Sequence, residues 1–120
     1  MLYAILCYNS EAVLEDLPAD EHRAMMDGIA DAMHELGAQG KLGPVARLSG
    51  TAEAVTLRPG DEPVVIDGPF AETKEQLLGF WIVRCETREE AVEAARLLAR
   101  QRPTGALEIR PITEFRPDPA

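Results

Sequence analysis

The sequence predicts an α+β domain with a ferredoxin-like fold and an added β-hairpin. Three observations lead to this prediction. The expected elements follow the order strand, helix, strands, strand, helix, strand, which is the split βαβ pattern of that fold. Each expected helix has a single apolar stripe, as helices that cover one face of a sheet do. The chain has 120 residues, which allows one domain spanning residues 1–120.

Composition and charge exclude several classes of protein. Hydrophobic residues make up 46% and charged residues 28%, and the formal net charge is −9. Nucleic acids and anionic membranes attract positively charged surfaces, so neither is expected as a partner. No apolar run approaches the ~18 residues of a membrane-spanning helix, and residues 1–8 lack the basic start of a secretory signal. Cys7 and Cys85 have no CxxC spacing, which indicates packed thiols and a cytoplasmic location; the alternative is a functional disulfide.

The N-terminal third predicts one strand and one helix. Residues 2–8 form a short apolar run typical of a strand, and residues 9–17 are expected to connect it to the helix. The helix is expected to begin at Pro18 and to end at Gly37 and Gly40. Its inward face consists of apolar residues at helical spacing: Met25, Met26, Ile29, Met33 and Leu36.

The middle of the chain predicts the added hairpin. Residues 54–58 and 63–66 are short β-type runs on either side of the turn Pro59-Gly60-Asp61. Residues 42–49 predict a weaker strand before the hairpin, because Gly43-Pro44 interrupts its start.

The C-terminal third predicts a strand, a helix and a last strand. The two strands are expected at residues 79–85 and 106–112. Thr87 and Glu90 have the spacing of a capping box, which predicts the start of the helix between them. The inward face of this helix is expected to contain Ala91, Ala94, Ala95 and Leu98.

The predicted strands are apolar on both faces, although two helices can cover only one face of the sheet. In the first strand Tyr3, Ile5 and Cys7 alternate with the equally apolar Leu2, Ala4 and Leu6. An antiparallel sheet with one solvated face would alternate apolar and polar residues. We therefore expect a homodimer packed sheet to sheet, with a cleft for a small-molecule ligand. The alternative is that the hairpin and the C-terminal tail cover this face.

The two histidines lie on different faces of the expected helix. His22 falls on the inward stripe in the first turn, whereas His34 falls on the polar side. The dipole at a helix N-terminus disfavours a protonated histidine, so His22 is expected to be neutral and able to act as a base. The alternative is a hydrogen-bonded core or interface histidine. Two histidines without a cysteine pair do not make a zinc site, and no metal or cofactor is expected.

Asp67 closes a predicted strand and precedes Gly68-Pro69. A carboxylate at a strand end can orient a histidine or hold a substrate group, and the alternative is that it caps its own turn. Arg47, Arg58 and Phe70 are the candidate substrate-binding residues, the two arginines for an anionic group.

Residues 67–84, DGPFAETKEQLLGFWIVR, closely resemble the signature of the DGPF group within the YCII-related family. The N-terminal LYAILCY, Thr56-Leu57-Arg58 and the C-terminal GALEIRP are similar to that family as well. The resemblance implies a ferredoxin-like fold and dimers with a barrel-like sheet interface, similar to muconolactone isomerase. It also implies an active site of one histidine and one aspartate. These carry over to His22, in a stretch that resembles Pro-Ala-x-His, and to Asp67.

Two functions follow as expectations. The first is a cofactor-free acid–base enzyme of the lyase, isomerase or dehydrochlorinase type, with His22 as the acid or base and Asp67 orienting it. The alternative is a non-catalytic dimer that binds a ligand or a protein, linked to the sigma factors that often accompany DGPF proteins. The fold does not decide between them. An enzyme requires His22 and Asp67 to converge in an open cleft, whereas a protein-binding module would expose an apolar patch.

Overall fold

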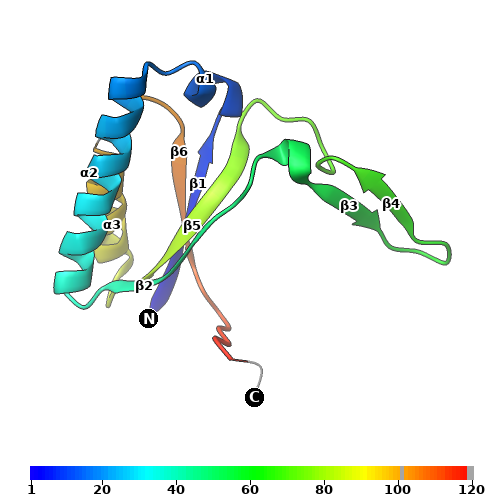
Figure 1. Ribbon diagram of the computed structural model, residues 1–120. Helices are drawn as coiled ribbons and strands as arrows, with labels where there is room; N and C mark the ends of the chain where they lie inside the picture. Colours follow the sequence, from blue (N-terminus) through cyan, green and yellow to red (C-terminus); the bar gives the residue numbers. More distant parts are fainter. Residues whose placement is uncertain (101, 119–120) are drawn as a thin grey trace.

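The computed structural model, which describes residues 1–100 and 102–118, contains a four-stranded antiparallel sheet with two long helices on one face (Figure 1). The strand order is β2-β5-β1-β6, so the first strand lies in the middle between β5 and β6. The strands are β1 Leu2–Asn9, β2 Leu42–Arg47, β5 Gln76–Arg84 and β6 Ala106–Pro111. This arrangement, with a long helix after β1 and another after β5, is compatible with the predicted ferredoxin-like fold.

The two long helices are α2, Ala19–Ala38, and α3, Arg88–Ala99. In α3 the hydroxyl of Thr87 accepts a hydrogen bond from the backbone N–H of Glu90 at 3.2 Å, which confirms the predicted N-terminal cap. None of the helices in the described residues is long and apolar enough to cross a membrane. The buried residues of the two helices agree with the predicted stripes: Met25, Ile29, Ala32 and Leu36 in α2, and Ala91, Ala94, Ala95 and Leu98 in α3.

A short helix, α1 Glu11–Glu15, occupies the segment that was expected to be only a connection. Ser10 caps it by accepting a hydrogen bond from the N–H of Val13 at 3.2 Å. A helix of little more than one turn is too short to show a hydrophobic period, so only its cap residue marks it in the sequence. The helix narrows one end of the space between α2 and the sheet.

The predicted hairpin forms a separate two-stranded sheet, β3 Val55–Arg58 with β4 Val64–Asp67, which we call the arm. Figure 1 shows the arm extending away from the four-stranded sheet. Its base is held by hydrogen bonds from the N–H of Gly68 to the carbonyl of Ala54 at 2.7 Å and from the Thr56 hydroxyl to the carbonyl of Gly68 at 2.8 Å. The arm therefore does not fold over the sheet, which was one alternative for covering its second face.

The core lies between the sheet and the helices. From β1 it contains Tyr3, Ile5 and Cys7, and both Cys7 and Cys85 are buried free thiols, in agreement with a packing role. The opposite face of β1 carries Leu2, Ala4, Leu6 and Tyr8, which are half-buried. Both long helices lie on one side of the sheet in Figure 1, so this second apolar face lacks a helical cover. We refer to it as the open face.

Candidate functional site

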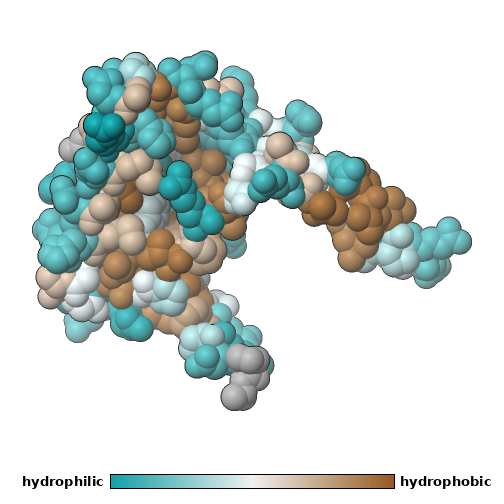
Figure 2. Space-filling model, in the orientation of Figure 1, coloured by the Kyte–Doolittle hydropathy of each residue, from teal (hydrophilic) through white to brown (hydrophobic). Residues whose placement is uncertain are grey.

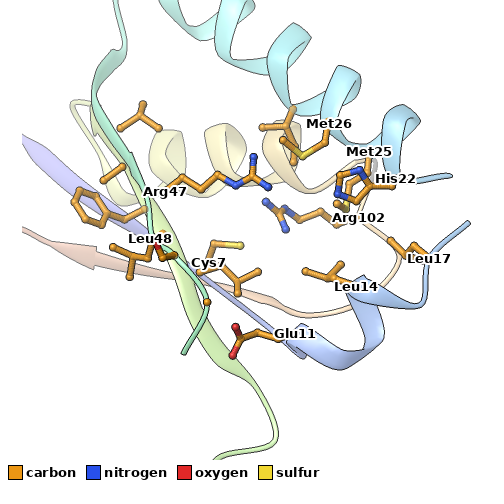
Figure 3. A pocket seen from close by; sticks show the side chains of 18 of the residues that line it. Cys7, Glu11, Leu14, Leu17, His22, Met25, Met26, Arg47, Leu48 and Arg102 are labelled. Atoms are coloured by element: carbon orange, nitrogen blue, oxygen red, sulfur yellow. The ribbon is translucent and has the colours of Figure 1, made fainter. Parts of the chain in front are cut away.

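A cavity of about 880 Å³ lies between α2 and the sheet, at the end of the molecule that carries α1. Its volume falls within the range of roughly 300–1,000 Å³ that is typical of small-molecule sites. One wall is α2, the floor is β1 and β5, and the remaining sides come from α1, β2 and the segment that follows β2. Figure 3 shows the side chains that enter it.

Most of the cavity wall is apolar. The inward stripe of α2 contributes three methionines and Ile29, α1 contributes Leu14, and β5 contributes Trp81. Methionine is flexible and polarisable, so a wall rich in methionine adapts to ligands of different shape. The same periodicity that predicts the core face of α2 therefore also supplies the lining of the cavity.

Two glycines allow β2 to pack closely against β5 and thereby close one side of the cavity. A Cβ atom at Gly43 would lie 2.8 Å from the carbonyl oxygen of Ile82. A Cβ atom at Gly79 would collide with the carbonyl oxygen of Ala46. A larger residue at either position must displace the backbone of β2, because the colliding atoms belong to the main chain.

We expect Gly79→Ala to lower the free energy of unfolding by about 1–3 kcal/mol, the range typical of overpacking. Urea denaturation followed by circular dichroism measures this change. Gly37→Ala is the matched control, because a Cβ atom at Gly37 meets no atom within 4 Å. In a helix this control should raise stability by up to ~1 kcal/mol. Equal stability of the two variants would show that β2 does not depend on the contact at Gly79.

Three arginines line the cavity: Arg23 is exposed on α2, whereas Arg47 and Arg102 reach in from opposite walls. Arg47 is the last residue of β2, and Arg102 follows α3. Figure 3 shows the guanidinium groups of both residues pointing toward one another inside the cavity. The guanidinium carbon of Arg102 lies 5.4 Å from the centroid of the Trp81 ring, a distance suited to a cation–π contact. That contact holds Arg102 over the floor of the cavity.

The acidic side chains of the cavity are not paired with these arginines. The carboxylate of Glu11 accepts hydrogen bonds from the Thr51 backbone N–H at 2.9 Å and from the Thr51 hydroxyl at 2.5 Å. Glu15 is exposed at the α1 end. Within residues 1–100 and 102–118, no carboxylate lies within 4.0 Å of a guanidinium nitrogen of Arg47 or Arg102. The buried Nε atom of Arg102 likewise has no hydrogen-bond partner among these residues.

Cys7 lies on the floor of the cavity and is 3% exposed. Burial raises the pKa of its thiol, and the nearby positive charge of Arg102 lowers the pKa by a smaller amount. The net effect is a raised pKa, so the thiol is protonated at neutral pH. Cys7 therefore contributes apolar surface to the cavity and is not an activated nucleophile.

His22 lies where the sequence predicts it, in the first turn of α2 on the inward side, and it lines the cavity. It is half-buried, whereas His34 is exposed. In the described part of the chain no hydrogen-bond partner contacts the His22 ring, which distinguishes it from a hydrogen-bonded core histidine. Figure 3 shows its imidazole on the α2 side of the cavity.

The structure brings His22 and Arg47 together, but it places the other predicted site residues elsewhere. Asp67 and Arg58 end the two strands of the arm, and Phe70 follows in the next loop with 75% of its surface exposed. None of these three is among the described residues that line the cavity. Within one chain, His22 and Asp67 therefore do not meet in this cavity, because the arm stands away from the sheet.

Arg102, Trp81 and Leu14 are residues of the cavity that the sequence did not indicate. Arg102 is far from Arg47 in the sequence, and only the crossing of α3 over the sheet brings the two close. Among the described residues, no group of three or more histidine, cysteine, aspartate or glutamate side chains is placed to hold a metal ion. The polar lining of the cavity thus consists of one imidazole, three guanidinium groups, two carboxylates and one hydroxyl group on an apolar background: His22, Arg23, Arg47, Arg102, Glu11, Glu15 and Ser49.

Two comparisons with known proteins each cover nearly the whole chain. The sequence model of the YCII-related domain family matches residues 1–116 of the chain. The chain is 46% identical over 119 residues to an uncharacterised protein of Rhizobium meliloti (strain 1021), and the match covers 98% of this chain and 96% of that protein. The two matches together cover all the helices and strands of the chain. The chain therefore belongs to the YCII-related family.

Proposed function

We propose that this protein binds a small molecule in the cavity under α2 and acts on it as a cofactor-free acid–base enzyme. The observation that carries the proposal is the position of His22: its ring faces a ligand-sized cavity with no hydrogen-bond partner in the described chain. The reaction class is that of a lyase, isomerase or dehydrochlorinase. The substrate is an enolisable or halogenated molecule with an apolar, aromatic body.

The chemistry follows from the groups in the cavity. A neutral imidazole can accept a proton from a carbon atom next to a carbonyl group and return it to another atom. The negative charge that develops on the substrate is stabilised by positive groups that already face it, and the guanidinium groups of Arg47 and Arg102 do so. The apolar wall strengthens these interactions by excluding water.

The direct test is exchange of the methylene protons of phenylpyruvate for deuterium, followed by NMR in D₂O. Phenylpyruvate combines an enolisable carbon, an aromatic body and a carboxylate. The wild-type protein is expected to accelerate the exchange over buffer alone. A rate equal to that of buffer would contradict the proposed reaction.

Asp67 can take part in the reaction if it comes from a second chain. We propose that the protein is a homodimer in which the arm of one chain packs on the other and brings Asp67 toward the partner's cavity. The open face and the arm support this arrangement. The arm exposes a row of apolar side chains, Val55 63%, Leu57 60%, Val64 52%, Val65 67% and Ile66 45%. Figure 2 shows them as a hydrophobic patch far from the helices, which a monomer would leave in water.

Mixing two inactive variants tests the role of Asp67. His22→Gln and Asp67→Asn are each expected to lose proton exchange as homodimers. After unfolding and refolding together, mixed dimers would contain one site with both wild-type groups if the two residues come from different chains. Activity is then expected to return. No recovery in mixed dimers would contradict a shared site.

A second candidate function is a non-catalytic dimer that binds a ligand or a protein, linked to sigma-factor regulation. The exposed apolar patch of the arm favours it, because such patches mark interaction surfaces. The Asp67-Gly68-Pro69-Phe70 motif supports assignment to the DGPF group, from which this link comes. Binding of phenylpyruvate without any proton exchange would favour this second function.

A further inference from the structure

The guanidinium groups of Arg47 and Arg102 face each other in the cavity without a carboxylate of the described residues to neutralise them. Arg47 and Arg102 point toward one another, and no carboxylate in the described residues lies within 4.0 Å of either. Arg47 is exposed and Arg102 is half-buried; their like charges repel, and the buried Nε atom of Arg102 without a partner adds a further cost. An anion placed between the two groups would remove both penalties.

The arginines of the cavity, unpaired among the described residues, contrast with the negative net charge of the whole chain. Its formal net charge is −9, yet the cavity acid Glu11 is hydrogen-bonded to Thr51 instead of to an arginine. Acidic side chains are therefore abundant but are not used to neutralise Arg47 and Arg102. The fold keeps both guanidinium groups available to a ligand.

We propose that Arg47 and Arg102 form the carboxylate subsite of this cavity, and that its ligand is a monocarboxylate with an apolar, aromatic body. The proposal rests on the proposed function in one respect, that this cavity is the ligand site. Guanidinium groups bind carboxylates through paired hydrogen bonds. The methionines and Ile29 of α2 then contact the rest of the molecule.

The α1 end of the cavity disfavours a second negative charge on the ligand. Glu11 and Glu15 line this end and would repel a second anionic group. The rest of the lining is mostly apolar and, apart from His22, Arg23 and Ser49, offers few hydrogen-bond partners to such a group. A monocarboxylate with an aromatic body can pair its charge with Arg47 and Arg102 and place its ring against the apolar wall. A dicarboxylate or a polyphosphate suits this arrangement less well.

Trp81 allows binding to be measured directly. It is the only tryptophan of the chain, it lines the cavity, and Arg102 lies over its ring. We expect 3-phenylpropanoate to change its fluorescence with saturation, and the uncharged 3-phenylpropanamide to bind at least ~10-fold more weakly. A loss of this size corresponds to a charge-assisted hydrogen bond.

Arginine-to-methionine variants distinguish the contribution of the positive charge to binding from that of the shape of the cavity. Arg47→Met and Arg102→Met are each expected to weaken binding of the acid by about 10- to 100-fold and to leave binding of the amide unchanged. Arg100→Met is the matched control, because Arg100 is exposed and does not line the cavity, and it should bind both probes as the wild type does. Circular dichroism establishes that each variant is folded.

A second measurement covers the case in which a methionine variant does not fold. 3-Phenylpropanoate is expected to raise the Tm of the wild type more than the amide does, and Arg102→Lys should retain part of this difference. Equal binding of acid and amide, or no binding of the acid up to millimolar concentration, would overturn the carboxylate subsite. Loss of proton exchange in the presence of selective acid binding would instead overturn only the proposed reaction.

Discussion

Replacing His22 by glutamine is expected to slow the protein-dependent proton exchange of phenylpyruvate by about 10²–10⁴-fold, the usual contribution of a positioned acid or base. Glutamine has a similar length and keeps hydrogen-bonding atoms, but it does not accept a proton at neutral pH. Binding of the acid to the cavity should change little, because Arg47 and Arg102 remain. The effect is therefore expected in the exchange rate at saturation and not in the affinity.

His34→Gln is the matched control for this experiment. His34 lies on the same helix, is exposed, and does not line the cavity. It should exchange protons at the wild-type rate. If both variants keep the wild-type rate, His22 is not the acid–base group, and if both lose it equally, the loss reflects the helix and not the imidazole.

The second large effect concerns the dimer. Leu6 lies in the middle of the open face, on the central strand, where it is opposite Phe80 of β5. Leu6→Glu would place an unpaired carboxylate in the proposed interface, and an isolated buried charge costs several kcal/mol. We expect the wild type to be a dimer at micromolar concentration and this variant to be a monomer in analytical ultracentrifugation.

Two further variants define the interface. Ala30→Glu adds the same charge at an exposed position of α2 and should remain dimeric. Val65→Glu adds it to the arm, where Val65 is 67% exposed, and should weaken the dimer if the arm packs on the second chain. A monomeric wild type, or a Leu6→Glu variant that stays dimeric, would contradict the proposed sheet-to-sheet packing.

Hydrophobic periodicity was sufficient to predict the elements that build the core. The helical spacing of Met25, Ile29 and Leu36 predicts the face of α2 that the structure buries, whereas β1, apolar on both faces, is predicted only as a strand. The capping residue Thr87 marks the start of α3 correctly. The position of His22 on the inward side of α2 follows from the same geometry, which is why this residue of the candidate site was found.

Other features depend on distances in space that the sequence does not contain. The arm was predicted as a hairpin, but its direction relative to the four-stranded sheet leaves no pattern in the sequence, so the separation of Asp67 from the cavity was not evident. Arg102, which follows α3, enters the cavity with its guanidinium group over the Trp81 ring. A lone arginine after a helix has no pattern that distinguishes it from a solvated one.

The central claim, that the cavity under α2 is the ligand site, is tested most directly by ¹H–¹⁵N NMR during titration with phenylpyruvate. We expect shift changes at Cys7, His22 and Arg47, all of which line that cavity, and none at the exposed His34. Saturating changes confined to the arm, around Val65 and Phe70, with none at the cavity residues, would contradict the claim.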